Sequence, residues 1–70
     1  MNIKWAKNTE ISFCIKDGKA ILSANEDGLV SLAAQFTALA CEASGNHIHY
    51  DENNAFEEGS CELIVEKKDN

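Results

Sequence analysis

The sequence of 70 residues contains no proline and no arginine, so its six basic residues are all lysines. It has no stretch near the roughly 20 apolar residues of a membrane-spanning helix. Its first ten residues also lack the apolar segment of a secretory signal. Its net charge is −6, whereas binding to nucleic acid phosphates requires clustered positive charge. We therefore expect a cytoplasmic protein that binds neither a membrane nor nucleic acid.

Cysteine is scarce, and its spacing excludes two common uses. Cys14, Cys41 and Cys61 lie far apart, without the Cys-x-x-Cys pair of a zinc ribbon or a thioredoxin-like motif. Their odd number also argues against a disulfide framework. We expect reduced thiols that act as small apolar side chains.

Motifs that carry chemistry are lacking as well. No glycine-rich phosphate loop occurs, and no nucleophile lies beside an evident base. A chain of 70 residues buries only about 60% of its unfolded surface, which leaves little room for an enclosed active site. The apolar share of 44% is nevertheless that of a folded protein. The sequence predicts a single domain over residues 1–70, without enzymatic activity and without a cofactor.

Positive charge is missing from the middle of the chain. Residues 20–66 contain nine acidic residues and no lysine, because the lysines all lie in residues 1–19 and 67–70. An acidic surface of this kind attracts a basic partner over a distance. The simpler interpretation is that the acidic residues keep a small protein soluble.

The dipeptide Asp17-Gly18 predicts a two-residue β-hairpin turn, since both central positions of the favoured turn need positive φ. Pairing across this turn places six apolar residues on one face of the hairpin: Ile11, Phe13, Ile15, Ala20, Leu22 and Ala24. The turn and the apolar alternation thus predict the same register over residues 11–24.

A helix is predicted after this hairpin. Asn25 or Asp27 can cap it, and the acidic residues Glu26 and Asp27 suit the positive end of the helix dipole. Apolar residues then recur at spacings of three and four: Leu29, Leu32, Ala33, Phe36, Leu39, Ala40 and Ala43. Gly45 suits the left-handed residue just beyond the helix.

Two strands are predicted after the helix. Residues 47–51 alternate polar and apolar, as a half-buried strand does, and residues 60–67 form the last strand after a polar acidic loop.

Residues 3–7 are predicted to form a short first strand with two possible orientations of Trp5. A two-residue turn at Asn8-Thr9 would place Trp5 on the sheet face away from the helix, and a three-residue loop would turn it towards Phe13 and the core. We favour the core, because burial of a tryptophan is worth several kcal/mol.

These elements predict an α+β fold, a single antiparallel β-sheet with one α-helix packed on one face in the order β-β-β-α-β-β. The expected core between sheet and helix is Phe13, Leu22, Leu32, Phe36, Leu39, Ile48, Tyr50 and Leu63. The other face is expected to be open and to display Ser12, Lys16, Ser23, His47, His49, Asp51, Glu62, Ile64 and Glu66.

His47, His49 and Asp51 form the one catalytic-looking cluster of the sequence. Alternate residues of a strand point to one face, about 6.6–6.8 Å apart, and two histidines at that spacing can share a zinc ion. No fourth ligand is evident nearby. We favour a solvent-exposed strand face without a metal and keep these three residues as the candidates of the weaker metal interpretation.

The segments His47-Ile-His-Tyr-Asp51 and Gly59-Ser-Cys-Glu-Leu-Ile-Val65, joined by an acidic loop, resemble a family of small bacterial immunity proteins, immunity protein family 32. The resemblance covers about residues 18–66 and includes Gly28-Leu29 at the start of a helix rich in Leu and Ala. The matching positions are His47, His49, Asp51, Gly59, Ser60, Glu62 and Leu63. The resemblance implies an α+β fold and a protein that neutralises a toxin encoded beside it, and it implies no catalytic residues.

The sequence therefore predicts a non-enzymatic binder that blocks a cognate toxin through the acidic part of the open sheet face. Charge favours a basic toxin, such as a nuclease. The candidate contact residues are His49, Asp51, Glu57, Glu58, Glu62 and Glu66. A second interpretation is a small metal-binding or enzyme-accessory domain that uses the His-x-His-x-Asp strand. A third is a homodimer through the open sheet face.

Overall fold

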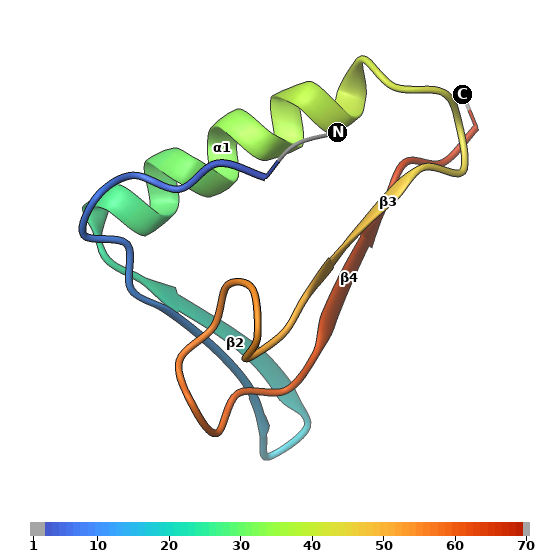
Figure 1. Cartoon of the computed structure of the whole chain (residues 1–70). Helices are drawn as coiled ribbons and strands as arrows, with labels where there is room; N and C mark the ends of the chain where they lie inside the picture. The colour runs from blue at the N-terminus through green and yellow to red at the C-terminus, as the bar shows by residue number, and fades with distance from the viewer. Residues whose placement is uncertain (1–2, 70) are drawn as a thin grey trace.

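The computed structural model describes residues 3–69, which form one α-helix and two antiparallel hairpins arranged as the sides of an open triangle (Figure 1). In chain order the elements are β1 (Ile11–Lys16), β2 (Lys19–Ala24), α1 (Glu26–Ala40), β3 (His47–Tyr50) and β4 (Leu63–Glu66). The fold class is α+β, as predicted.

The first hairpin has the predicted turn and register. Asp17 and Gly18 adopt φ values of 52° and 76°, which the tight turn requires. Ile11 lies opposite Ala24 and Phe13 lies opposite Leu22. The dipeptide at the turn therefore fixes the alignment of both strands.

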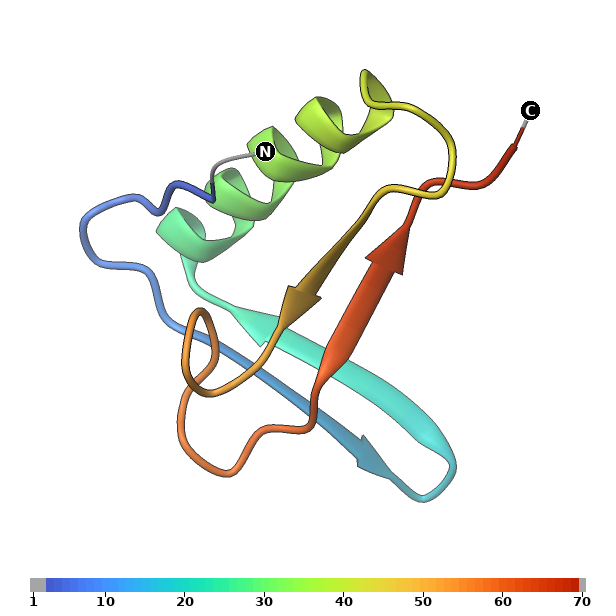
Figure 2. The same cartoon turned by 45° about the vertical axis from the view of Figure 1, so that its right-hand side comes forward.

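Burial along this hairpin is more limited than the alternation predicts. Ile11 and Phe13 are buried, whereas Ile15 and Leu22 have exposed fractions of 64% and 38%. The turn end of the hairpin extends away from α1 (Figure 2), in agreement with the exposure of these side chains. The prediction that Leu22 belongs to the core is therefore wrong.

The prediction of a single sheet is wrong in detail, because residues 3–69 contain two separate two-stranded sheets, β1-β2 and β3-β4. Residues 3–10 form no strand. The outer edge of β1 is taken by the loop between β3 and β4: the N–H groups of Glu57 and Cys61 donate to the carbonyls of Ile11 and Phe13, both at 2.8 Å. A third strand would need these same carbonyls.

The N-terminal segment runs along α1 instead of entering a sheet. The N–H of Ala6 donates to Ser31 Oγ, and Gln35 Nε2 donates to the carbonyl of Lys4, both at 2.8 Å. Trp5 is half-buried and packs against the core, with its ring centroid 6.0 Å from that of Tyr50. Trp5 thus turns towards the core, as favoured from the sequence, although the predicted strand is absent.

The start and the end of α1 have clear causes. Asn25 is the cap, as predicted, and its side-chain oxygen accepts from the N–H of Gly28 at 2.8 Å. The helix ends at Ala40 rather than at Ala43, and Lys67 Nζ donates to the carbonyl of Ala40 at 2.7 Å. Gly45 has a φ of 91° but lies in the turn before β3, beyond the helix cap. No helix in residues 3–69 has the length and apolar character to cross a bilayer.

The buried side of α1 is rotated from the predicted apolar stripe. It consists of Gly28, Ser31, Leu32, Gln35 and Leu39, whereas Leu29 and Phe36 have exposed fractions of 56% and 38%. A Cβ at position 28 would lie 2.8 Å from Ile11 Cγ1, so the glycine allows α1 to contact β1 closely. This contact fixes the rotation of the helix about its axis. The prediction that Phe36 is a core residue is therefore wrong.

The core lies inside the triangle and is centred on Tyr50, which is fully buried. The buried apolar residues are Ile11, Phe13, Leu32, Leu39, Ile48, Tyr50 and Phe56, with Leu63 partly buried against them. Tyr50 donates to Gln35 Oε1 at 2.7 Å and stacks on Phe56, with ring centroids 5.8 Å apart. Ile11 and Phe56 were absent from the predicted core list, and Phe56 comes from the acidic loop.

Burial raises the pKa of Tyr50 to about 12, from 10.0 for an exposed tyrosine. Because the pKa of Tyr50 is higher in the folded chain than in the unfolded chain, the protonated tyrosine stabilises the fold fully below about pH 10. This contribution is lost as the pH rises towards about 12. We expect the free energy of unfolding to fall by about 2–3 kcal/mol across this window. Urea titrations at several pH values check this result, with Tyr50→Phe as the control that should lack this part of the decrease.

Candidate functional site

The second hairpin carries the exposed polar cluster that the sequence predicts. His47 lies opposite Glu66 and His49 lies opposite Ile64, so these side chains share one face of β3-β4. Ile48 and Tyr50 point the other way and are buried. We call the exposed side the acidic hairpin face and define it as His47, His49, Glu62, Ile64 and Glu66, all of which are exposed.

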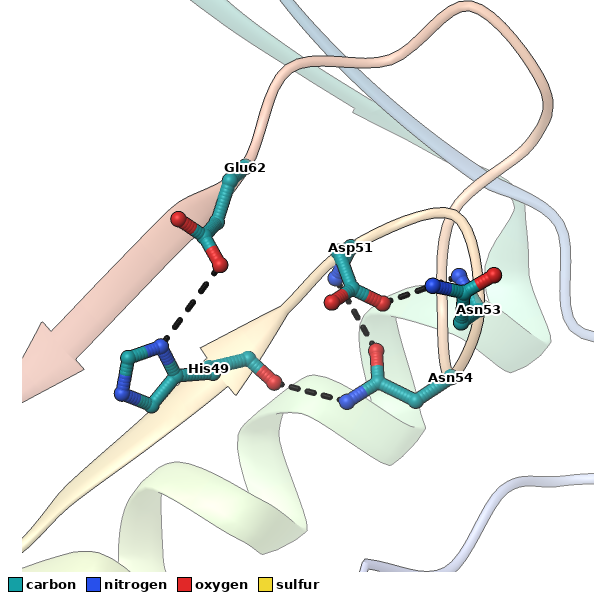
Figure 3. A network of polar contacts seen from close by, with 5 residues as sticks. All are labelled: His49, Asp51, Asn53, Asn54 and Glu62. Carbon is teal, nitrogen blue, oxygen red and sulfur yellow. Dashed lines mark hydrogen bonds and ion pairs between the residues drawn. The ribbon is translucent and has the colours of Figure 1, made fainter.

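The side chains of His49 and Glu62 lie within ion-pair distance of each other on this face (Figure 3). His49 Nδ1 lies 3.6 Å from Glu62 Oε2, and about half of each side chain is exposed. The His47 and His49 rings meet edge to face, with centroids 4.8 Å apart. An ion pair in such exposed surroundings contributes at most about 1 kcal/mol, so Glu62 remains available to a partner.

Asp51 was predicted to align with the two histidines, but its carboxylate takes part in a turn instead. Asp51 Oδ1 accepts from the N–H of Asn53 at 2.8 Å, and the N–H of Asp51 donates to Asn54 Oδ1 at 2.9 Å (Figure 3). Asn54 Nδ2 in turn donates to the carbonyl of His49 at 2.8 Å. Asp51 therefore fixes the point at which the chain leaves β3.

The residues of the weaker metal interpretation do not come together as a ligand set. Across residues 3–69, no group of three His, Cys, Asp or Glu side chains is close enough to hold a metal ion. His47 and His49 lie side by side, while the Asp51 carboxylate is bonded to the turn. A stable protein zinc site needs at least three protein ligands.

Replacement of both histidines tests whether they have a structural role. Because both side chains are exposed, we expect His47→Gln/His49→Gln to change the free energy of unfolding by less than about 0.5 kcal/mol. A chelator should leave the melting temperature of the parent unchanged. A chelator-induced decrease that disappears in the double variant would demonstrate a bound metal.

The loop over residues 51–62 joins β3 to β4 and presents the remaining acidic candidates. Phe56 is buried and anchors the loop in the core, with its ring centroid 6.2 Å from that of Phe13. Glu57 and Glu58 follow Phe56 directly and are exposed. Since the N–H of Glu57 is bonded to β1, the backbone beneath these two carboxylates is held in place.

The predicted candidates therefore divide into two groups, one on the hairpin and one in the loop that joins its strands. His49, Glu62 and Glu66 lie on the acidic hairpin face, and Asp51, Glu57 and Glu58 lie in the loop that continues it. The prediction of one open sheet face that also displays Ser12, Lys16 and Ser23 is wrong, because these three residues belong to the separate first hairpin.

Ile64 was not among the predicted contact residues, although it lies at the centre of the acidic hairpin face. It lies on β4 between Glu66 and Glu62, the residue just before this strand, and its exposed fraction is 51%. An apolar side chain surrounded by charged groups is typical of a protein-binding surface. The alternation of residues 62–66 is the signal that identifies it.

A comparison with protein families identifies the chain. The family described as immunity protein 32 matches residues 20–68, which include almost all of β2, all of α1 and the whole second hairpin. The chain belongs to the immunity protein 32 family. The family match contains the complete acidic hairpin face and its loop. Neither the curated proteins nor the solved structures give a match.

Proposed function

We propose that this member of the immunity protein 32 family is a single-domain, non-enzymatic cytoplasmic protein that binds a cognate toxin with a basic surface. It does so through the acidic hairpin face and the loop over residues 51–62, and it neutralises the toxin by covering its working surface. The observation that carries the proposal is that the exposed acidic residues of this face and loop lie entirely within the segment matched by the family.

The charge and the exposure of this surface support protein binding. Between Ala20 and Glu66 the chain has no lysine or arginine, and Lys67 is the first basic residue that follows the carboxylates of Glu57, Glu58, Glu62 and Glu66 in sequence. Their side chains are exposed, which suits attraction of an oppositely charged partner. Ile64 adds an apolar centre within a polar rim.

The test is a titration of the chain against the toxin encoded beside it. We expect a stable complex, with toxin activity lost as one equivalent of the chain is added. The double variant Glu62→Ala/Ile64→Ala should weaken binding at least about 10-fold, since central interface residues carry most of the affinity. Ile21→Ala is the matched control, because Ile21 is an exposed isoleucine on the first hairpin.

Two results would contradict the proposal. One is the absence of a complex at about 10 µM protein, a concentration at which even a weak specific pair associates. The other is an equal loss of affinity in the Ile21→Ala control, which would move the toxin contact away from the acidic hairpin face.

A further inference from the structure

The outer edge of β4 has backbone groups that are not paired with another strand. At the end of the second hairpin that lies away from its loop, the N–H of Lys67 donates to the carbonyl of Asn46 at 2.9 Å. In an antiparallel ladder, residues that bond to the partner strand alternate with residues that do not. The N–H and C=O groups of Ile64 and Glu66 therefore point away from β3. Figure 2 shows β4 as the outer strand of this hairpin.

The loop over residues 51–62 covers the corresponding groups on two other strands. Its N–H groups donate to two outward carbonyls of β1, each at 2.8 Å. On β3, Asn54 Nδ2 donates to the outward carbonyl of His49, also at 2.8 Å. Within residues 3–69 no bond of this kind reaches the outward groups of β4. This edge can therefore accept the backbone of another strand.

The lysine that follows β4 does not protect this edge. Natural proteins often keep foreign strands away from a free edge with a lysine side chain. Lys67 Nζ instead donates to the carbonyls of Ala40 and Glu42, at 2.7 and 2.6 Å, so its ammonium group is held at the end of α1. Lys68 lies two residues beyond the strand, and β4 itself contains no basic residue.

The side chains beside the edge indicate which kind of strand fits it. Glu62, Ile64 and Glu66 occupy alternate positions on the acidic hairpin face, and all three are exposed. Side chains that lie directly opposite each other on neighbouring strands are about 4.5–5.5 Å apart, so opposite charges attract there and like charges repel. The complementary strand carries a basic, an apolar and a basic residue at alternate positions.

The first hairpin also has an open edge, on β2, but its charge does not suit a basic strand. The pair Lys16 and Lys19 closes the two-residue turn, so the backbone groups of Ala20 and Leu22 point outwards. The sequence of β2 begins with a lysine and contains no acidic residue. A basic strand is therefore attracted to β4 rather than to β2, and β2 provides a matched control.

We propose that the cognate toxin adds an extended strand to the outer edge of β4. Its backbone bonds to the outward groups of Ile64 and Glu66, its basic side chains lie opposite Glu62 and Glu66, and an apolar side chain lies opposite Ile64. The inference rests on the proposed function and specifies how the toxin makes its contact. In strand addition, backbone bonds provide affinity and alternate side chains provide specificity.

Amide hydrogen exchange, followed residue by residue by NMR, tests the strand addition on the unaltered chain. In the free chain the amides of Ile64 and Glu66 should exchange rapidly, whereas that of Val65 is protected by β3. In the complex with the toxin encoded beside the chain, Ile64 and Glu66 should exchange at least about 100-fold more slowly. The amides of Ala20 and Leu22 on the β2 edge should not change.

A proline substitution tests the backbone bond separately from the charge. Glu66→Pro removes the outward N–H together with the carboxylate, whereas Glu66→Gln removes the negative charge and keeps the N–H. Proline is tolerated where the N–H of an edge strand faces solvent, so both variants should fold, which circular dichroism verifies. We expect Glu66→Pro to bind the toxin at least about 10-fold more weakly than Glu66→Gln, because a backbone acceptor of the toxin then loses its donor.

The same comparison on β2 is the control for the proline itself. Leu22→Pro removes an outward N–H from the other open edge, and Leu22→Ala keeps it. These two variants should bind the toxin with equal affinity. A loss of affinity in Leu22→Pro alone, or protection of the Ala20 and Leu22 amides in the complex, would move the added strand to β2 and overturn the proposal.

Two further results would overturn the strand addition and leave the proposed function intact. One is a stable complex in which the amides of Ile64 and Glu66 exchange as rapidly as in the free chain. The other is equal toxin affinity of Glu66→Pro and Glu66→Gln. In either case the toxin contacts only the side chains of the acidic hairpin face. The absence of any complex would instead contradict the proposed function, and the strand addition with it.

Discussion

A Tyr50→Ala variant should lose about half of the free energy of unfolding of the chain at 25 °C. Truncation of a buried aromatic side chain costs about 3–5 kcal/mol, and a domain of this size has a total stability of only about 4–10 kcal/mol. Tyr50 is fully buried, contacts the rings of Trp5, Phe36 and Phe56, and satisfies the buried amide of Gln35. Its loss therefore opens a cavity between the N-terminal segment, α1 and the loop over residues 51–62, and it leaves the Gln35 side-chain oxygen without this donor.

Urea unfolding followed by circular dichroism measures this effect. Phe36→Ala is the informative comparison, because Phe36 is another aromatic residue of the same cluster but has an exposed fraction of 38%. We expect Phe36→Ala to cost about half as much as Tyr50→Ala, since part of its ring already contacts water. Equal costs for the two variants would show that α1 is packed more deeply than its outer surface indicates.

Reversal of the four acidic residues Glu57, Glu58, Glu62 and Glu66 to lysine should slow association with the toxin by about 10- to 100-fold at low salt. This prediction rests on the proposed function. Opposite charges on two proteins accelerate their encounter, and like charges retard it. The four side chains are exposed, so the variant should still fold. For the parent chain, association should slow between low and physiological salt while dissociation changes less.

Stopped-flow kinetics at several salt concentrations provides the measurement. A matched pair of double variants separates local from overall charge. Glu62→Lys/Glu66→Lys changes the acidic hairpin face, and Glu10→Lys/Asp69→Lys makes the same change in net charge at exposed positions outside it. Glu62→Lys/Glu66→Lys should slow association more than Glu10→Lys/Asp69→Lys. An association rate that is independent of salt concentration and equal in the two double variants would mean that the acidic residues serve solubility alone.

Local signals in the sequence predicted the features that depend on neighbouring residues. Asp17-Gly18 fixed the register of the first hairpin, and Asn25 fixed the start of α1. The alternation over residues 47–51 placed His47 and His49 outside and Tyr50 inside. In each case the cause lies within a few residues of its effect.

Features that depend on distant contacts were not predictable in this way. The rotation of α1 follows from the contact of Gly28 with Ile11 and from polar bonds made by Ser31 and Gln35 to the N-terminal segment. A prediction from the spacing of apolar residues places none of these three helix residues on the buried side. The strands form two sheets because the loop over residues 51–62, rather than another strand, bonds to the edge of β1. These bonds are made by backbone N–H groups, so the pattern of side chains in the sequence does not predict them.

The same limit applies to the candidate site. Alternation predicted the shared face of His49, Glu62 and Glu66, because strand geometry alone determines it. The turn at Asp51 depends on the N–H of Asn53, which donates to the Asp51 carboxylate, and on the Asn54 side chain, which accepts from the N–H of Asp51. A short Asp-x-Asn sequence after a strand favours such a turn over a continued strand.

The burial of Phe56 separates two roles within the loop. Phe56 packs in the core and the N–H groups of Glu57 and Cys61 bond to β1, whereas the carboxylates of Glu57 and Glu58 are exposed. A partner that meets Glu57 and Glu58 therefore meets a segment that is already ordered, so the complex does not lose the conformational entropy of an unfolded loop. Exchange of residues 57 and 58 should change the stability little, and under the proposed function it would redirect the chain to a toxin with a different surface while the fold is kept.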